Sequence, residues 1–322
     1  MKFLVDKRTE LMSIILALSQ GNEYIEEHFS FDVQDKYRQR VYNHFFKFKK
    51  HKAVELATEI AKSDKGFNFD NPIRIAFSLT EQLDFDGTIE DYLLKELENE
   101  KLLKDFMAEV VKFAKDTNFK EFYLANSDYY SLKIEELKQM FNSAIFVCEL
   151  QKFLKVKIKD DFNINIVPML INANHGFKVD GDNFANIGML SEDFKTIEKF
   201  NNGTIHTIIH EFAHNFVNCY TNNNQLSIPE NLKKELINLG YTNPIVYLND
   251  TIVRAITIRL REKIQNIDIQ KFFNIEDKFG FVFVRKAYQE LLVYENQSIS
   301  WEEYFPKLLS SIIKKQETKK TV

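Results

Sequence analysis

The chain has 322 residues and a formal net charge of −4, from 43 lysines and arginines against 47 aspartates and glutamates. This balance argues against the basic surface that binds nucleic acid, so we expect no nucleic-acid partner. Hydrophobic residues make up 44% of the chain, enough for a sizeable globular core. No apolar run reaches the roughly 18 residues of a membrane-spanning helix, so no membrane span is expected.

The N-terminal segment carries charges that a secretion signal lacks. Asp6 and Glu10 lie just before a short apolar run at residues 11–18, where a signal peptide has only positive charge. Apolar residues in this run recur at helical spacing, which predicts a helix. We expect a cytoplasmic protein, or an extracellular or membrane-anchored one if an N-terminal signal has been removed.

The first half of the sequence predicts one helix after another. Apolar residues recur at three- and four-residue spacing, with charged residues between them, over 33–48, 52–63, 89–115 and 133–154. Residues 1–154 are therefore predicted to form a helical N-terminal region.

Near residue 155 the pattern changes to alternation, which predicts strands within 164–171 and 182–189. Asp180-Gly181 is a predicted turn between two strands. Pro168 cannot donate a hydrogen bond to a neighbouring strand, so it favours an edge strand or a bulge over a central strand.

Helices return after residue 203. Thr204 is the predicted N-cap of the first helix, and the segment TNNN at 221–224 is predicted to end it. Two more are predicted, at about 229–239 and 249–264. The fold class is therefore α+β, predominantly helical with a small sheet. Residues 155–322 form a second region, or both regions form one continuous domain.

The first of these helices carries the strongest functional signal. Residues 210–214, HEFAH, fit the pattern H-E-x-x-H. Residues four apart share a helix face, so His210 and His214 can reach one metal ion while Glu211 points to its side. Two imidazoles and a carboxylate leave a fourth position of a Zn²⁺ site open for water, and Glu211 can act as general base and then general acid. The alternative is a buried amphipathic helix whose histidines occur by chance.

Two other histidines deserve an interpretation. His206 lies one turn earlier, and three histidines at this spacing span about 12 Å of helix, too far to bind one ion. We therefore expect it to support the site or to lie on the surface. His175 lies on the predicted edge strand, where it could contact substrate, although a solvated loop histidine is the preferred interpretation.

A third protein ligand must come from later in the chain. The acidic residues on predicted helices are Glu230, Glu235, Asp250 and Glu262. Asp250 has a purely structural explanation, because an acidic residue at a helix start interacts well with the helix dipole and with Arg254 four residues on. The same pair could be a metal ligand steered by an arginine.

Two resemblances extend this interpretation. The helix at 210–214 resembles that of the zincin metallopeptidases, and Glu235 follows His214 at a spacing close to that of zincins with a glutamate ligand. Over most of its length the chain resembles a bacterial family known as a domain of unknown function, through RTELMSIILAL, FKKHKAVELA, HEFAHNFVN and NDTIVRAITIRL. This resemblance implies a zinc ligand just before VRA, a glutamate in the family and Asp250 here. Aspartate binds zinc at similar distances, so Asp250 is preferred and Glu235 stays open.

The sequence thus predicts a zinc-dependent metallopeptidase that hydrolyses bonds in a peptide or protein substrate, with His210, His214 and Asp250 holding the metal. The resemblance to zincins implies a substrate held along an edge strand, within 164–171 or 182–189, and an oxyanion donor. Possible donors are Tyr241, Tyr247, Tyr288 and Tyr294. The alternatives are a non-catalytic helical binding or scaffold protein with a structural or vestigial metal site, and a hydrolase of other substrates. The oligomeric state is left open.

Overall fold

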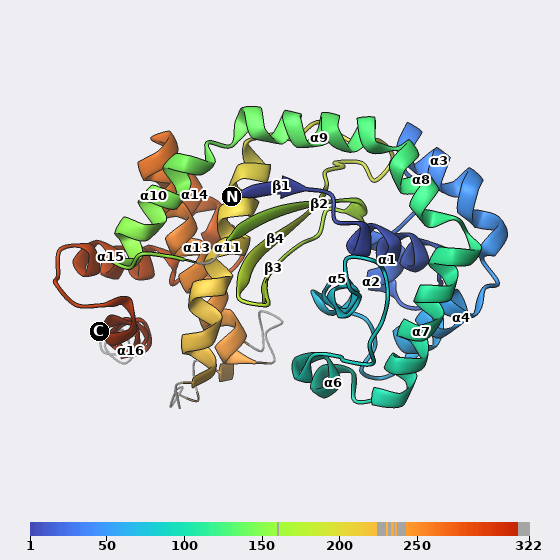
Figure 1. Cartoon of the computed structure of the whole chain (residues 1–322). Coiled ribbons are helices and arrows are strands. Elements are labelled where there is room, and N and C mark those ends of the chain that lie inside the picture. Colours follow the sequence, from blue (N-terminus) through green and yellow to red (C-terminus); the bar gives the residue numbers. More distant parts are fainter. Residues whose placement is uncertain (160, 224–229, 231–232, 235, 237–242, 315–322) are drawn as a thin grey trace. The chain divides into compact units, whose positions relative to one another are not determined.

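The computed structural model describes residues 1–159, 161–223, 230, 233–234, 236 and 243–314 (Figure 1). Backbone contacts group the chain into two compact units, Met1–Phe141 with Asp161–Ile205 and Asn142–Asp160 with His206–Val322. Among the described helices, none combines the length and the apolar character needed to cross a membrane. The predicted α+β class with a majority of helix is confirmed.

The first unit contains nine α-helices among its described residues, joined by loops and two 3₁₀ turns. They are α1 (Lys7–Leu18), α2 (Glu23–His28), α3 (Lys36–Phe45), α4 (Lys52–Lys62), α5 (Asn71–Arg74), α6 (Asp91–Leu97), α7 (Glu100–Asp116), α8 (Phe119–Ala125) and α9 (Ser127–Met140), with η1 (Phe46–Phe48) and η2 (Ile75–Ser78).

The predicted helix over 89–115 is two helices, α6 and α7. Glu98 adopts a left-handed backbone with φ of 52°, which ends α6. The Asn99 side chain then accepts a hydrogen bond from the backbone N–H of Leu102 and starts α7. Continuous helical periodicity hid this break, because the apolar spacing resumes on the other side of it.

A four-stranded sheet completes the first unit. Its strands are β1 (Lys2–Leu4), β2 (Phe162–Ile171), β3 (Asn174–Val179) and β4 (Asp182–Met189), and they lie side by side in the order β1-β2-β4-β3 (Figure 1). β1 and β4 run parallel to β2, and β3 runs antiparallel to β4. Asp180 and Gly181 both have positive φ and form the predicted turn between β3 and β4.

Both strands predicted as edges, β2 and β4, lie inside the sheet, and its edges are β1 and β3. Pro168 is accommodated by a bulge, since the register passes from Val167 opposite Gly188 to Ile171 opposite Met189. Arg38 satisfies the displaced backbone by donating to the carbonyl oxygens of Pro168 at 2.8 Å and Met169 at 3.0 Å. The bulge was correctly predicted and the edge position was wrong.

In the second unit all regular elements of the described residues are helices. They are α10 (Ser143–Leu154), most of α11 (Asn202–Asn223), α13 (Pro244–Gln265), α14 (Ile269–Lys278), α15 (Val284–Glu295) and α16 (Trp301–Lys314). The predicted helix over 133–154 is again two, α9 and α10, with Asn142 capping α10. α13 packs against α10 and α15, and this places it in the core of the unit.

Candidate metal centre

Helix α11 carries His210 and His214 well inside its length. It begins at Asn202, two residues before the predicted start. Asn201 is the cap, because its side-chain oxygen accepts from the N–H of Gly203 at 2.7 Å, while the hydroxyl of Thr204 accepts from the N–H of Asn201 at 3.1 Å. The prediction of Thr204 as the N-cap was therefore wrong, although it does belong to the capping arrangement.

The opposite face of α11 fixes the orientation of the histidines. Ile208, Ile209 and Phe212 are completely buried, and the Phe212 ring stacks on Phe146 of α10 at 5.6 Å between centroids. A helix anchored on this apolar face cannot rotate without exposing it to water.

Helix α13 supplies Asp250 from its second turn. The helix starts at Pro244, with the side chain of Asn243 accepting from the N–H of Ile245 at 3.0 Å. The prediction that Asp250 begins the helix was wrong, so an interaction with the helix dipole does not explain it. Its predicted pairing with Arg254 is confirmed at 2.9 Å.

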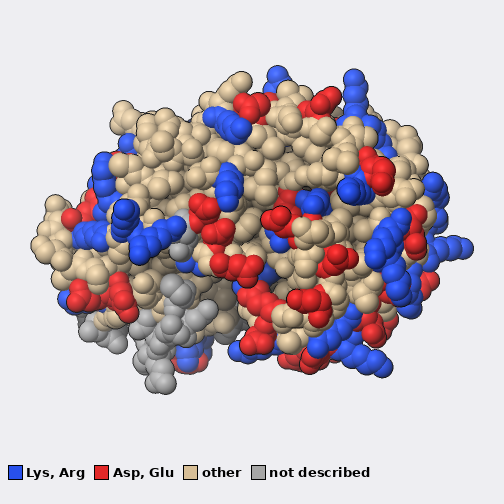
Figure 2. Space-filling view, viewed as in Figure 1, with Lys and Arg blue, Asp and Glu red and all other residues tan. Residues whose placement is uncertain are grey.

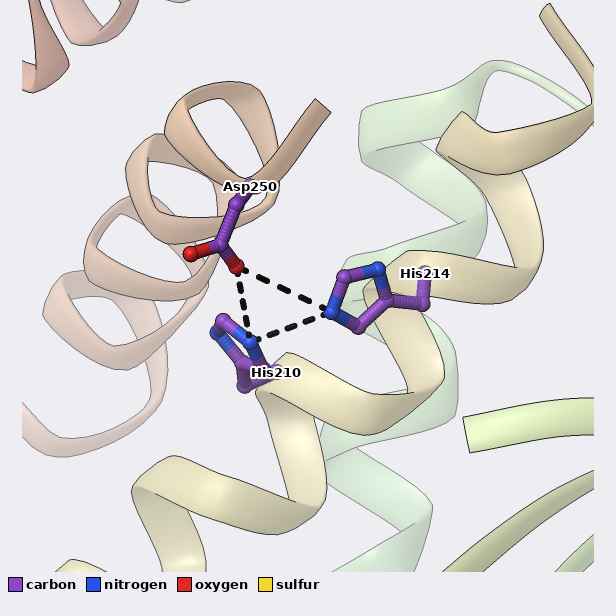
Figure 3. A group of neighbouring side chains, drawn as sticks. All are labelled: His210, His214 and Asp250. Atoms are coloured by element: carbon purple, nitrogen blue, oxygen red, sulfur yellow. Dashed lines mark hydrogen bonds and ion pairs between the residues drawn. The ribbon is translucent and has the colours of Figure 1, made fainter. Parts of the chain in front are cut away.

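Three donor atoms converge between α11 and α13, as Figure 3 shows. Nε2 of His210 lies 3.2 Å from Nε2 of His214 and 3.4 Å from Oδ1 of Asp250. Nε2 of His214 lies 3.9 Å from the same carboxylate oxygen. Ligands about 2.0–2.1 Å from a tetrahedral zinc ion are about 3.3 Å apart. The donor set therefore fits one zinc ion with little adjustment.

Two asparagines orient His214. Its Nδ1 lies 3.2 Å from the side-chain oxygen of Asn218, which also accepts from the Asn249 amide at 2.9 Å. Since that oxygen is an acceptor, the proton of His214 is on Nδ1 and the lone pair of Nε2 faces His210 and Asp250. This is the usual arrangement of a histidine that binds metal.

Asp250 is oriented by a partly buried chain of ion pairs. Arg254 donates through Nε to Oδ2 of Asp250 at 2.9 Å and through Nη1 to Glu276 at 2.8 Å. Its guanidinium also lies over the ring of Phe281, 3.9 Å from the centroid. Because Oδ2 is occupied by the arginine, Oδ1 alone is directed at the histidines.

The electrostatics keep the donors ready for a cation. Burial, with the charge of His210 as the second cause, lowers the pKa of His214 to about 4, so its ring is neutral at pH 7. Burial acts to raise the pKa of Asp250, but the hydrogen bond and charge of His210 and the charge of Arg254 outweigh it and hold that pKa well below its usual range. A neutral imidazole and an ionised carboxylate are the forms that bind zinc.

Glu211 lies next to His210 in sequence and is buried, with 8% of its surface exposed. The structure thus brings together His210, His214 and Asp250 with Glu211 beside them. Glu235 lies outside the described residues. Glu230 is exposed, and Glu262 accepts hydrogen bonds from Arg259 at 2.5 Å and from Tyr288.

The two remaining histidines of interest are placed differently. His206 is not a plain surface histidine, because its ring stacks on Phe272 at 5.5 Å and Nδ1 lies 3.4 Å from Nη1 of Arg261. His175 is not a solvated loop residue, because it lies on β3 and Nε2 is 2.8 Å from the Tyr24 hydroxyl.

The tyrosines predicted as possible oxyanion donors have other surroundings. Tyr247 is buried and donates to the carbonyl of Gly280 at 2.8 Å, and Tyr288 donates to Glu262. Tyr294 is buried beside Trp301. Tyr241 lies outside the described residues.

Sequence reasoning missed the supporting residues of the centre. Asn218 could have been found, because it follows His214 by one helical turn and shares its face. Asn249 precedes Asp250 in the sequence, but no helical spacing links it to His210 or His214, so the sequence did not identify it. Glu276 and Phe281 lie on later segments, and only the folded chain brings them to Arg254.

Neither a search of curated proteins nor a search of solved structures finds a match to this chain. A family model does match, over residues 1–311, which is nearly the whole length. The chain therefore belongs to the family described as Domain of unknown function (DUF4932).

Proposed function

We propose that this protein is a zinc-dependent metallopeptidase of the zincin type, with His210, His214 and Asp250 as zinc ligands and Glu211 as the catalytic residue. One observation carries the proposal. The two histidines of an H-E-x-x-H helix and a carboxylate from a second helix converge at distances that suit a tetrahedral ion.

The residues divide the chemistry among them. Zinc bound here would lower the pKa of a water molecule at its open position towards neutrality. Glu211, beside His210, would accept a proton from that water as it attacks a peptide carbonyl, and would deliver the proton to the leaving amine. Asn218 and Arg254 would hold His214 and Asp250 in the required orientation.

The set of two histidines and one carboxylate also suits iron(II) in oxygenases. Glu211 favours hydrolysis, because a carboxylate adjacent to the first ligand serves proton transfer. The identity of the metal is therefore the first thing to measure.

We expect about one zinc ion per chain in protein purified without chelator. Elemental mass spectrometry should find it in the wild type and in His206→Ala, which removes a histidine one turn away, but not in His210→Ala. Wild-type protein that neither retains nor binds zinc would contradict the proposal and favour a scaffold with a vestigial site.

The role of Glu211 is tested separately. We expect Glu211→Gln to keep its zinc and to lose at least about 100-fold in the rate of cleavage of a peptide library, as removal of a general base does. A chelator should abolish cleavage by the wild type. Equal rates for Glu211→Gln and wild type would refute the catalytic role, and zinc without cleavage of any peptide would favour the non-catalytic alternative.

A further inference from the structure

Helix α13 carries three arginines, and one of them has no counter-charge among the residues that the structure describes. Arg254 pairs with Asp250 and Glu276, and Arg259 pairs with Glu262 and Glu295. Arg261 forms no ion pair with any described residue, although only 4% of its surface is exposed.

Among the described residues, the contacts of Arg261 are all with neutral groups. Nε donates to the side-chain oxygen of Gln265 at 2.9 Å, and Nη1 lies 3.4 Å from Nδ1 of His206. The guanidinium lies 4.8 Å from the centroid of the Phe272 ring. Nη2 has no hydrogen-bond partner within the described part of the chain. Burial lowers the pKa of Arg261, and no carboxylate acts to raise it.

A buried guanidinium without an anion is unfavourable. Arginine stays protonated in proteins, so it cannot relieve the cost of burial by losing its proton. Buried charges are normally paired for this reason. Folding has already removed most of the water around Arg261, so an anion that binds here does not have to displace it. The planar guanidinium would then bind the anion through its N–H donors.

His206 adds a second donor to the same place. Its Nδ1 accepts from Arg261, so the neutral ring carries its proton on Nε2, and that N–H has no partner among the residues described. The ring of His206 stacks at 6.4 Å from the ring of His210, the first proposed zinc ligand. This distance equals about two residues of extended peptide.

We propose that Arg261 and His206 bind a carboxylate of the peptide substrate about two residues from the cleaved bond. The proposal rests on the proposed peptidase function and adds the substrate class to it. The carboxylate is either the free C-terminus of the peptide or an acidic side chain, because the same donors recognise both.

The test measures binding rather than cleavage. Zinc-loaded Glu211→Gln protein is mixed with three pools of randomised N-acetylated pentapeptides, and the retained peptides are identified by ultrafiltration and mass spectrometry. The first pool has free C-termini and no acidic side chains. The second has the same sequences as C-terminal amides. The third consists of amides with one glutamate at each position in turn.

We expect the first or the third pool to be retained at least about 10-fold over the second, as a charge-assisted hydrogen bond provides. Retention of the first pool identifies a C-terminal carboxylate, and retention of the third identifies an acidic side chain. The preference should vanish when Arg261→Met is added and persist when Arg259→Met is added as the matched control. Equal retention of all three pools, or a preference that survives Arg261→Met, would overturn the proposal.

The result is independent of catalysis. If wild-type protein cleaves no peptide but the Glu211→Gln protein retains peptides with a carboxylate preferentially, the peptidase function fails and the carboxylate site stands. A stability measurement adds a second check, because Arg261→Met removes an unpaired buried charge. We expect its unfolding temperature to be no lower than that of wild type, whereas Arg259→Met should unfold at a lower temperature. A clear loss of stability in Arg261→Met would show that its charge is compensated in the free protein, and would count against the proposal.

Discussion

Asp250 presents one oxygen to the histidines because Arg254 holds the other. The arginine itself is fixed by Glu276, which is 2% exposed, and by the ring of Phe281. A change at Arg254 would free the carboxylate to rotate and would leave Glu276 buried without its cation. In the proposed zinc site, Arg254 would thus be a positioning residue that acts on the metal through Asp250.

We expect Arg254→Met to weaken zinc binding by about 10–100-fold, the usual cost of removing a group that orients a metal ligand. Arg254→Lys keeps the charge but lacks the planar fork that reaches both carboxylates, so its affinity should be intermediate. Competition with a zinc-binding dye gives the affinities, and the visible spectrum of the Co²⁺ form reports the ligand geometry. Arg259→Met is the control on the same helix, and an unchanged affinity in Arg254→Met would contradict the assigned role.

At the level of elements, a buried carboxyl group joins three helices of the first unit. Glu10 of α1 accepts a hydrogen bond from Tyr37 of α3, whose hydroxyl lies 2.8 Å from that of Tyr130 of α9. Glu10 is completely buried, and burial raises its pKa from 4.5 to about 7 despite the hydrogen bond from Tyr37. At a pH between these two pKa values, the folded protein therefore keeps a proton on Glu10 that the unfolded chain releases.

This difference makes stability depend on pH. Between pH 4.5 and about 7 the folded state binds more protons at Glu10 than the unfolded state does. The contribution of Glu10 is therefore fully present below pH 4.5 and is lost as the pH rises through about 7. The two pKa values differ by an amount worth up to about 3 kcal/mol.

Glu10→Gln should remove the penalty of ionising this side chain. We expect its free energy of unfolding, relative to wild type, to rise between pH 5 and pH 8 by up to about 3 kcal/mol. Urea unfolding with a chelator present measures this difference. Glu121→Gln, at an exposed position of α8, is the control and should show no such trend. A pH-independent difference for Glu10→Gln would contradict the raised pKa.

At the level of the whole molecule, the proposed zinc ligands all belong to the second unit. Zinc should therefore stabilise the helices that carry them without a direct effect on the sheet. A ligand at a free concentration of about 100 times its dissociation constant stabilises the folded state by about 2.7 kcal/mol.

Hydrogen exchange followed by mass spectrometry can map this effect. With zinc in excess we expect exchange to slow by up to about 100-fold in α11 and α13, and little in β2 and β4. His210→Ala should show no slowing with zinc and serves as the control. Equal protection of the sheet and of the two helices would contradict a metal site confined to the second unit.

The surface of the molecule carries both signs of charge. On the face shown in Figure 2, lysines and arginines lie among aspartates and glutamates. The absence of a nucleic-acid partner stays a prediction, and so do the cytoplasmic location and the peptide substrate.

The sequence by itself determined the features that depend on neighbours along the chain. Helical spacing puts His210 and His214 on one face and pairs Asp250 with Arg254, and Asp180-Gly181 specifies a turn, because each needs only local backbone geometry. The ends of elements were less predictable, as the breaks at Glu98 and Asn142 show.

The tertiary structure decided what depends on distant partners. β2 became an inner strand because the three residues of β1, near the N-terminus and about 160 residues earlier in the sequence, pair with it. No local signal in the sequence indicates that pairing. The approach of Asp250 to the two histidines and the support from Glu276 likewise arise only when α11, α13 and α14 pack together. The same packing leaves Arg261 without a counter-charge among the described residues. Periodicity shows which face of a helix is buried, but it does not show which residues of another helix that face will meet.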